Sequence, residues 1–101
     1  MNENSYCKLE IFIPETHLPA LQKALQEADA GHIGRYDCCL SHSPVTVCRP
    51  GPVGELCLEP ERKVEVTCRT GQVERVMAAV RSVHPSANPV IYAIPLYRTS
   101  F

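Results

Sequence analysis

The chain has 101 residues, of which 45% are hydrophobic and 21% are charged, and its formal net charge is -1. This length suits one domain with one core, and the composition is too apolar and too weakly charged for an intrinsically disordered chain. Ten basic and eleven acidic residues form no long run of either sign, so neither nucleic acid nor an anionic membrane is expected as a partner.

The first residues, Met1–Ser5, lack the basic and then apolar pattern of a signal peptide. No apolar run reaches the roughly 20 residues that a membrane-spanning helix needs, so a cytoplasmic protein is expected. In that compartment the six cysteines would be reduced thiols that serve as core residues, metal ligands or redox groups. The sequence contains no C-x-x-C spacing, so thioredoxin-like or zinc-finger-like chemistry lacks its motif.

The first predicted strand alternates apolar and other side chains from Cys7 to Ile13, so one of its faces is apolar. The amphipathic helix that follows is expected to start at Thr16 as its N-cap. Pro19 then falls in the first turn, where its missing N–H costs nothing. The helix is expected to end at Gly31, because glycine tolerates the left-handed conformation of a helix C-cap.

A second strand is predicted from Arg35 to Leu40 or beyond. The next segment, Ser41–Glu61, is the richest in turn residues, and we expect a hairpin or loop insertion over about 43–60.

A turn centred on Ser43-Pro44 would fold the second strand back on itself. In that register Cys39 faces Cys48, and directly opposed thiols could share a soft metal ion. A tight two-residue turn needs a positive φ that Pro44 cannot adopt, so a wider loop with another register is the alternative.

The second half of the chain repeats the pattern of the first. A third strand is predicted with Val64, Val66 and Cys68 on one face. A helix then starts near Thr70 and stops before Pro85, because proline disfavours helix at the residue that precedes it. A fourth strand is predicted over Val90–Leu96, with Val90, Tyr92, Ile94 and Leu96 on one face.

An internal repeat with an offset of 55 residues organises these elements. Lys8–Ile13 falls on Lys63–Cys68, and the apolar positions of the two helices also coincide. The predicted halves are about 6–42 and 61–97 of a single domain over 1–101, and a chance match is the alternative. The order β-α-β-β-α-β predicts an α+β fold, a ferredoxin-like sandwich with both helices on one face of a four-stranded antiparallel sheet.

Several short motifs occur together between Tyr6 and Leu96. They are Gly31-His32-Ile33-Gly34-Arg35-Tyr36-Asp37-Cys38-Cys39, Arg49-Pro50, Gly54-Glu55, Leu58-Glu59, His84-Pro85 with Pro89, and Ile94-Pro95-Leu96. In combination they resemble the insert of Nif-three-like proteins, a PII-like and CutA-like ferredoxin-fold domain that lies between the two halves of a dinuclear-metal domain. The resemblance implies an inter-strand loop and a subunit cleft that bind small ligands, metal or a partner protein.

This sequence departs from the family pattern in several places, and its central loop is shorter than in typical inserts. The family's usual His-Pro-Tyr-Glu-Glu-Pro appears as His84-Pro85-Ser86-Ala87-Asn88-Pro89, without the aromatic residue and both carboxylates. The position after Asp37, commonly histidine in the family, is Cys38. The surrounding dinuclear-metal domain does not occur in the sequence, so no hydrolase activity is expected to carry over.

The candidate ligand-binding residues each have a structural alternative. A glycine turn can approach a ligand closely, but a helix C-cap followed by a strand needs the same glycines. An arginine can bind carboxylate or phosphate, although exposed arginines are usually solvated. A histidine at a helix end binds a ligand or interacts with the helix dipole. The set is Gly31, Gly34, Tyr36, Asp37, Arg49 and His84.

The candidate metal ligands are His32, Cys38, Cys39 and Cys48. Thiolates and imidazoles select zinc or copper over magnesium or calcium. Cys38 and Cys39 are adjacent on a predicted strand, so their side chains point to opposite faces and do not both enter one site without a bulge. The alternative is that the cysteines pack as small hydrophobic residues and His32 is a solvated loop residue.

Charged residues recur at matching positions of the two predicted central strands, namely Lys8 and Glu10 in one and Lys63 and Glu65 in the other. We interpret them as a cross-strand lattice of ion pairs rather than acid–base catalysts. The sequence contains no Gly-x-Ser-x-Gly, no Walker loop and no His-Glu-x-x-His, so an enzyme is not expected. Two hypotheses remain: a homo-oligomeric metal- or ligand-binding module that uses the 32–49 segment and His84, or a structural interaction domain that docks on another protein.

The predicted sheet has a second face that no element is left to cover. Phe12, Ile91 and Ala93 are expected to lie on that face. An exposed apolar surface of this kind usually marks an interface, so a homo-oligomer is expected. CutA-like relatives suggest a trimer, and a face-to-face dimer is the alternative.

Overall fold

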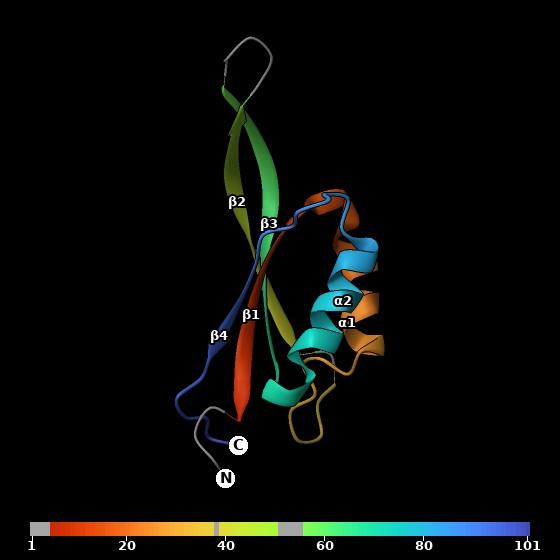
Figure 1. The fold of residues 1–101 in the computed structure, drawn as a ribbon, viewed down its shortest axis with the longest axis vertical. Coiled ribbons are helices and arrows are strands. Elements are labelled where there is room, and N and C mark those ends of the chain that lie inside the picture. The colour runs from red at the N-terminus through yellow and green to blue at the C-terminus, as the bar shows by residue number, and fades with distance from the viewer. Residues whose placement is uncertain (1–4, 38, 51–55) are drawn as a thin grey trace.

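The computed structural model describes residues 5–37, 39–50 and 56–101. It contains a four-stranded antiparallel sheet in the order β2-β3-β1-β4, and both helices cover the same face of it (Figure 1). The elements are β1 (Tyr6–Pro14), the 3-10 turn η1 (Glu15–His17), α1 (Leu18–Glu27), β2 (Leu40–Pro50), β3 (Leu56–Arg69), the 3-10 turn η3 (Thr70–Gln72), α2 (Val73–Val83) and β4 (Ile91–Pro95).

The β-α-β-β-α-β order and the pairing of the two repeated strands are confirmed. β1 and β3 lie side by side over nine residue pairs, from Tyr6 opposite Arg69 to Pro14 opposite Glu61. The two halves therefore meet at the centre of the sheet, where the repeat predicts neighbouring strands.

The core lies between the sheet and the two helices. Alternate residues of β1 are buried, as the period of two predicts, and the helices place one apolar stripe each against them. The fully buried large side chains are Leu9, Ile11, Ile13, Leu21, Leu25, Val64, Val76 and Val80. Neither described helix is long and apolar enough to cross a membrane.

The first helix differs from the prediction at both ends. It starts after a 3-10 turn, with His17 rather than Thr16 at its N-cap, and Pro19 lies in its first turn as expected. It ends at Glu27, four residues before Gly31, because Asp29 adopts a positive φ of 62° that is incompatible with a continuing helix.

The second strand starts later than predicted. Residues from Ile33 to Tyr36 form a tight turn closed by two hydrogen bonds between the backbones of those two residues, and Gly34 within it has φ 57°. β2 begins only at Leu40, so Arg35 and Asp37 belong to a connection and not to the sheet.

The turn expected at Ser43-Pro44 is wrong, because β2 runs through both residues to Pro50. A proline is tolerated there since β2 is an edge strand, where one row of backbone N–H groups has no strand partner. Cys48 lies opposite Leu58 of β3, and Cys39 precedes the other end of β2. The expected pairing of Cys39 with Cys48 is therefore wrong as well.

Beyond the Pro14–Glu61 pair, β2 and β3 continue as a two-stranded ribbon, which we call the arm (residues 46–50 and 56–60). It projects past the helices and stretches the molecule to 52 × 25 × 21 Å (Figure 1). The hairpin extension predicted between the two halves is thus a long, regular pair of strands.

The side chains of β4 face the opposite way from the prediction. Ile91 lies opposite Ile11, and Ala93 lies opposite Leu9, so both are on the helix-covered face. Tyr92 takes the position expected for Ile91 on the open face, next to Phe12 (ring centroids 6.2 Å apart). A shift of one residue in a strand exchanges its two faces, which is why the error affects the whole strand.

Candidate functional site

A groove of about 680 Å³ lies where the arm leaves the body of the protein. Its walls are the end of β1, His17 of η1, the base of the arm and the loop that joins α2 to β4, residues 84–90. Phe12, Pro14, Pro85, Pro89 and Val90 supply apolar surface, and Glu59 and Glu61 supply carboxylates. The groove therefore combines apolar surface with carboxylates in a hollow, which suits a small ligand better than a flat sheet does.

His84 holds the loop side of this groove. Its Nε2 lies 2.6 Å from the Phe12 carbonyl oxygen, and its Nδ1 accepts a hydrogen bond from the Ser86 N–H at 3.1 Å. An Nδ1 that accepts carries no proton, so the ring is the neutral form that donates from Nε2 to Phe12. Both ring nitrogens are thus occupied by backbone groups, and His84 lines the groove without a free nitrogen to offer a ligand.

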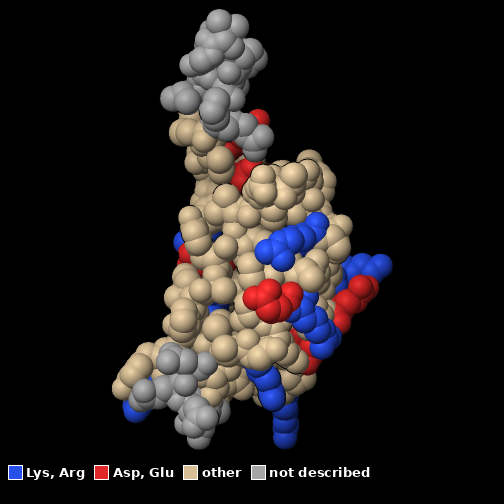
Figure 2. Space-filling model, in the orientation of Figure 1, with Lys and Arg blue, Asp and Glu red and all other residues tan. Residues whose placement is uncertain are grey.

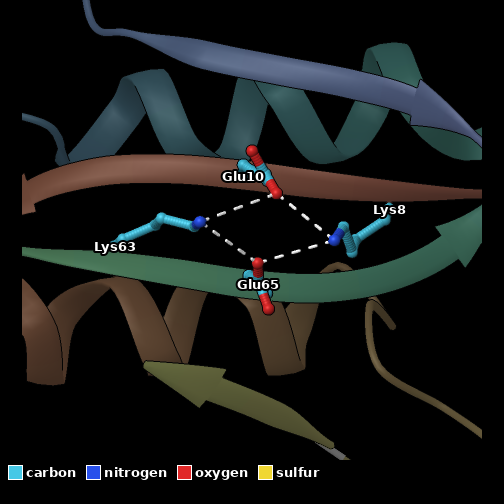
Figure 3. A network of polar contacts seen from close by, with 4 residues as sticks. All are labelled: Lys8, Glu10, Lys63 and Glu65. Carbon is cyan, nitrogen blue, oxygen red and sulfur yellow. Dashed lines mark hydrogen bonds and ion pairs between the residues drawn. The ribbon is translucent and has the colours of Figure 1, made fainter. Parts of the chain in front are cut away.

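The four charged residues of the central strands form the predicted lattice on the open face (Figure 3). Lys8 lies 3.3 Å from Glu10 and 3.5 Å from Glu65, while Lys63 lies 3.5 Å from Glu65 and 3.9 Å from Glu10. A hydrogen bond to Glu10 and the charge of Glu65 raise the pKa of Lys8. Although partial burial opposes it, the two lysines lower the pKa of Glu65. Both shifts favour the charged forms of Lys8 and Glu65, as expected for members of ion pairs.

Three potential metal ligands gather in the connection between α1 and β2. The Nδ1 of His32 lies 3.6 Å from the Oδ1 of Asp29 and 3.9 Å from the Oδ1 of Asp37, and all three ligand atoms lie within 4.8 Å of one another. The backbone around them is fixed, since the Gly31 N–H donates to the Thr67 carbonyl at 2.8 Å and the Cys39 N–H donates to the Gly31 carbonyl at 2.9 Å. Each of the three side chains is about half exposed.

The groove and this cluster lie at opposite ends of the sheet. His84 contacts Phe12, whereas His32 lines a smaller cavity with Tyr6, six residues earlier on β1. Six residues of strand span about 20 Å. Within one chain, His84 and His32 are therefore too far apart to contribute to one binding site.

The remaining candidate residues are spread along the molecule. Cys38 and the side chain of Arg49 lie outside the described part of the chain. Cys39 is half-buried, and Cys48 is exposed on the arm. Cys48 is nine positions after Cys39, and the residues between them belong to β2, so the two lie roughly 30 Å apart. Tyr36 is 73% exposed on its turn, far from the groove walls.

Sequence reasoning missed Asp29 and most of the groove. Asp29 precedes His32 by three residues, a spacing that was available as a signal for a shared ligand set. The groove offered no such signal. Its walls come from separate elements, and they lie next to one another only because β2 and β3 pair far enough to form the arm.

Comparison with known proteins gives the same fold. No protein-family model matches the chain. The chain is 36% identical over 91% of its length to the "GTP cyclohydrolase 1 type 2 homolog" of Halalkalibacterium halodurans, and 32% identical over 85% of its length to that of Listeria monocytogenes. It spans about a quarter of the length of these relatives.

Two solved structures identify which part is matched. A Bacillus cereus protein related to NIF3 superposes with a TM-score of 0.87 and 29% identity over 97% of this chain but 27% of that one. The divalent cation tolerance protein CutA of Archaeoglobus fulgidus superposes with a TM-score of 0.75 and 22% identity over 93% of this chain and 86% of that one. The chain has the fold of CutA and is similar in sequence to about a quarter of the NIF3-related protein.

These two similarities agree with the architecture described above. A match to nearly all of CutA and to a quarter of the NIF3-related protein means that the quarter itself has the CutA fold. At 22% identity the likeness to CutA concerns the fold alone. The resemblance expected from the glycine, His-Pro and Ile-Pro-Leu motifs is confirmed.

Proposed function

We propose that the chain is a non-catalytic binding module that works as a homo-oligomer, a trimer by preference over a dimer, with its ligand site in the groove. The arm is the observation that carries this proposal. A two-stranded ribbon is marginally stable by itself in water, and this one carries Leu58 with 67% of its surface exposed. On the face seen in Figure 2, Lys and Arg lie over the helical side, with Asp and Glu among them. A second copy would cover the arm.

The groove supports the ligand half of the proposal. Sites for small molecules usually enclose most of the ligand surface, and this groove is open on one side. A neighbouring copy that covers the arm would also close the groove, since the arm forms one of its walls. Non-catalytic binding is supported by His84, because both of its ring nitrogens are hydrogen-bonded to the backbone. It is also supported by the ion-pair lattice of β1 and β3, because its charged groups are paired with one another.

Replacing Leu58 with serine should weaken self-association, because each copy loses apolar contact area worth roughly 1.5 to 3 kcal/mol. We expect sedimentation equilibrium at micromolar concentration to give an oligomer for the unchanged protein and at least a tenfold weaker association for Leu58→Ser. Tyr36→Ser is the matched control, since Tyr36 is equally exposed but lies away from the arm. A monodisperse monomer for the unchanged protein would refute self-association and favour a domain that docks on another protein.

A second function, binding of zinc or copper, is favoured by the approach of Asp29, His32 and Asp37. Zinc accepts imidazole nitrogen and carboxylate oxygen, and three protein ligands leave one position for water or another group. The divalent cation tolerance named for the Archaeoglobus CutA is consistent with this function. The cysteines contribute less, because Cys39 precedes β2 and Cys48 lies near the far end of that strand.

We expect calorimetry to detect zinc binding that is lost or weakened at least tenfold in His32→Ala, because one of three ligands is removed. His42→Ala, an exposed histidine on β2, should bind as the unchanged protein does. Acidification should weaken binding as the ligands take up protons. Loss of binding in Cys39→Ser or Cys48→Ser, with His32→Ala unaffected, would contradict this site. The thiols would then be the metal ligands.

A further inference from the structure

His84 is the residue after the last turn of α2, and the chain leaves the helix there in an extended conformation. Two backbone groups meet its ring, the Phe12 carbonyl at Nε2 and the Ser86 N–H at Nδ1. We propose that His84 is a pH-sensitive latch, which holds the 84–90 loop against β1 when neutral and releases the loop beyond His84 when protonated. The latch rests on the proposed function in one respect only, namely that this loop forms one wall of the ligand groove.

The asymmetry of the two hydrogen bonds defines what protonation changes. Nε2 carries a proton in both forms, so its bond to Phe12 survives. Nδ1 accepts from Ser86 only in the neutral form, and in the imidazolium two N–H groups would face each other. Protonation therefore keeps the ring in place and detaches the chain that follows it.

The released segment is short, because the loop is fixed again at its far end. The Phe12 N–H donates to the Val90 carbonyl at 3.2 Å, directly before β4. Within the loop, the Asn88 N–H donates to the Ser86 hydroxyl at 3.2 Å, so residues 86–88 move as a unit with the Ser86 amide. Only the wall of the groove formed by 85–89 should loosen.

The other ionisable groups around the groove are His17, Glu59, Glu61 and Tyr92. Histidine is the side chain that ordinarily changes charge between pH 8 and pH 5, whereas glutamate and tyrosine ordinarily titrate outside this range. His17 is thus the group whose titration must be separated from that of His84.

The test is nuclear magnetic resonance of the whole chain, with the imidazole nitrogens and the backbone amides followed from pH 8 to pH 5. We expect His84 to be the Nε2–H tautomer at pH 8. As the ring takes up its proton, exchange of the Ser86 amide with water, corrected for its intrinsic pH dependence, should accelerate roughly fivefold, the size of one ordinary hydrogen bond. The Ala30 amide, bonded to the Leu25 carbonyl, should not change.

Two variants separate the bonds of the latch. In His84→Asn the side-chain oxygen can replace Nδ1, so Ser86 should stay protected at both pH values. In His84→Gln the longer amide can reach Phe12 but not Ser86, so Ser86 should exchange rapidly at both. His17→Gln should leave the pH response of Ser86 intact.

Three results would overturn the latch: an Nδ1–H tautomer at pH 8, no protonation of His84 down to pH 5, or protonation without any change at Ser86. None of these readouts depends on a ligand or on self-association. A failed latch would therefore leave the groove and the oligomer standing, and a failed groove would leave the latch standing.

Discussion

Substituting alanine for Gly31 should destabilise the protein by about 3 kcal/mol. Gly31 has φ 78°, which costs an L-residue roughly 1 to 2 kcal/mol. A Cβ at this position would also lie 2.6 Å from the carbonyl oxygen and 2.8 Å from the nitrogen of Cys39. Both are backbone atoms, so relief requires a shift of the chain entering β2, and misfits of this kind cost roughly 1 to 3 kcal/mol.

Gly34→Ala provides the matched control. Gly34 also has a positive φ, 57°, but a Cβ there would meet nothing within 4 Å. We expect it to cost about 1 kcal/mol, so that urea unfolding separates the steric clash from the backbone strain. Equal losses in the two variants would contradict the close approach of Gly31 to Cys39. The result also bears on the interpretation of these glycines as ligand contacts, because a structural need accounts for Gly31 without a ligand.

Raising the pH from 8 to 11 should cost the fold about 2 to 3 kcal/mol at one thiol. Burial, followed by the neighbouring Cys7, raises the pKa of Cys68 to about 11, against an ordinary value of 9.0. Below pH 9 both the folded and unfolded states keep the proton, so the contribution of Cys68 is fully present. Between pH 9 and pH 11 the unfolded chain releases this proton and the folded chain retains it, so stability falls as pH rises.

The loss is measured as the difference between urea unfolding at pH 8 and at pH 11. Tyrosines and lysines also titrate in this range, and Cys68→Ala isolates the thiol because it should lose less stability over the same interval. Cys48→Ala, at an exposed position on the arm, should retain the full dependence. An identical pH dependence in Cys68→Ala and the unchanged protein would rule out the contribution of this thiol.

The central part of the fold could be predicted because local pattern and tertiary contact agree there. β1 alternates buried and half-exposed residues without exception, and its charged positions match those of β3 at an offset of 55 residues. The same match placed Lys8, Glu10, Lys63 and Glu65 on one face, so the lattice followed from the pairing. Where one face of a strand is clearly polar, the sequence determines the register.

The errors arise where the local pattern is ambiguous or is overridden. Residues 91–94 of β4 are all apolar, so alternation could not distinguish its two faces, and pairing with β1 decided between them. Ser43-Pro44 has the composition of a turn, but β3 offers eleven partners to β2 and the edge position removes the penalty of the proline. The groove depends on this long pairing and could not be predicted from any one segment.

The strand order also determines when the chain can fold. In the described structure β1 pairs with β3 and β4, and β2 pairs with β3, so every strand partner of the first half lies in the second half. A nascent chain that ends at Pro50 lacks β3 and β4, so β1 and β2 have no strand to pair with. Folding then requires contacts between residues far apart in sequence, which places such chains among the slower single domains. During synthesis, β1 stays exposed until β3 has emerged, and the charges of Lys8 and Glu10 help to keep it from pairing with other chains.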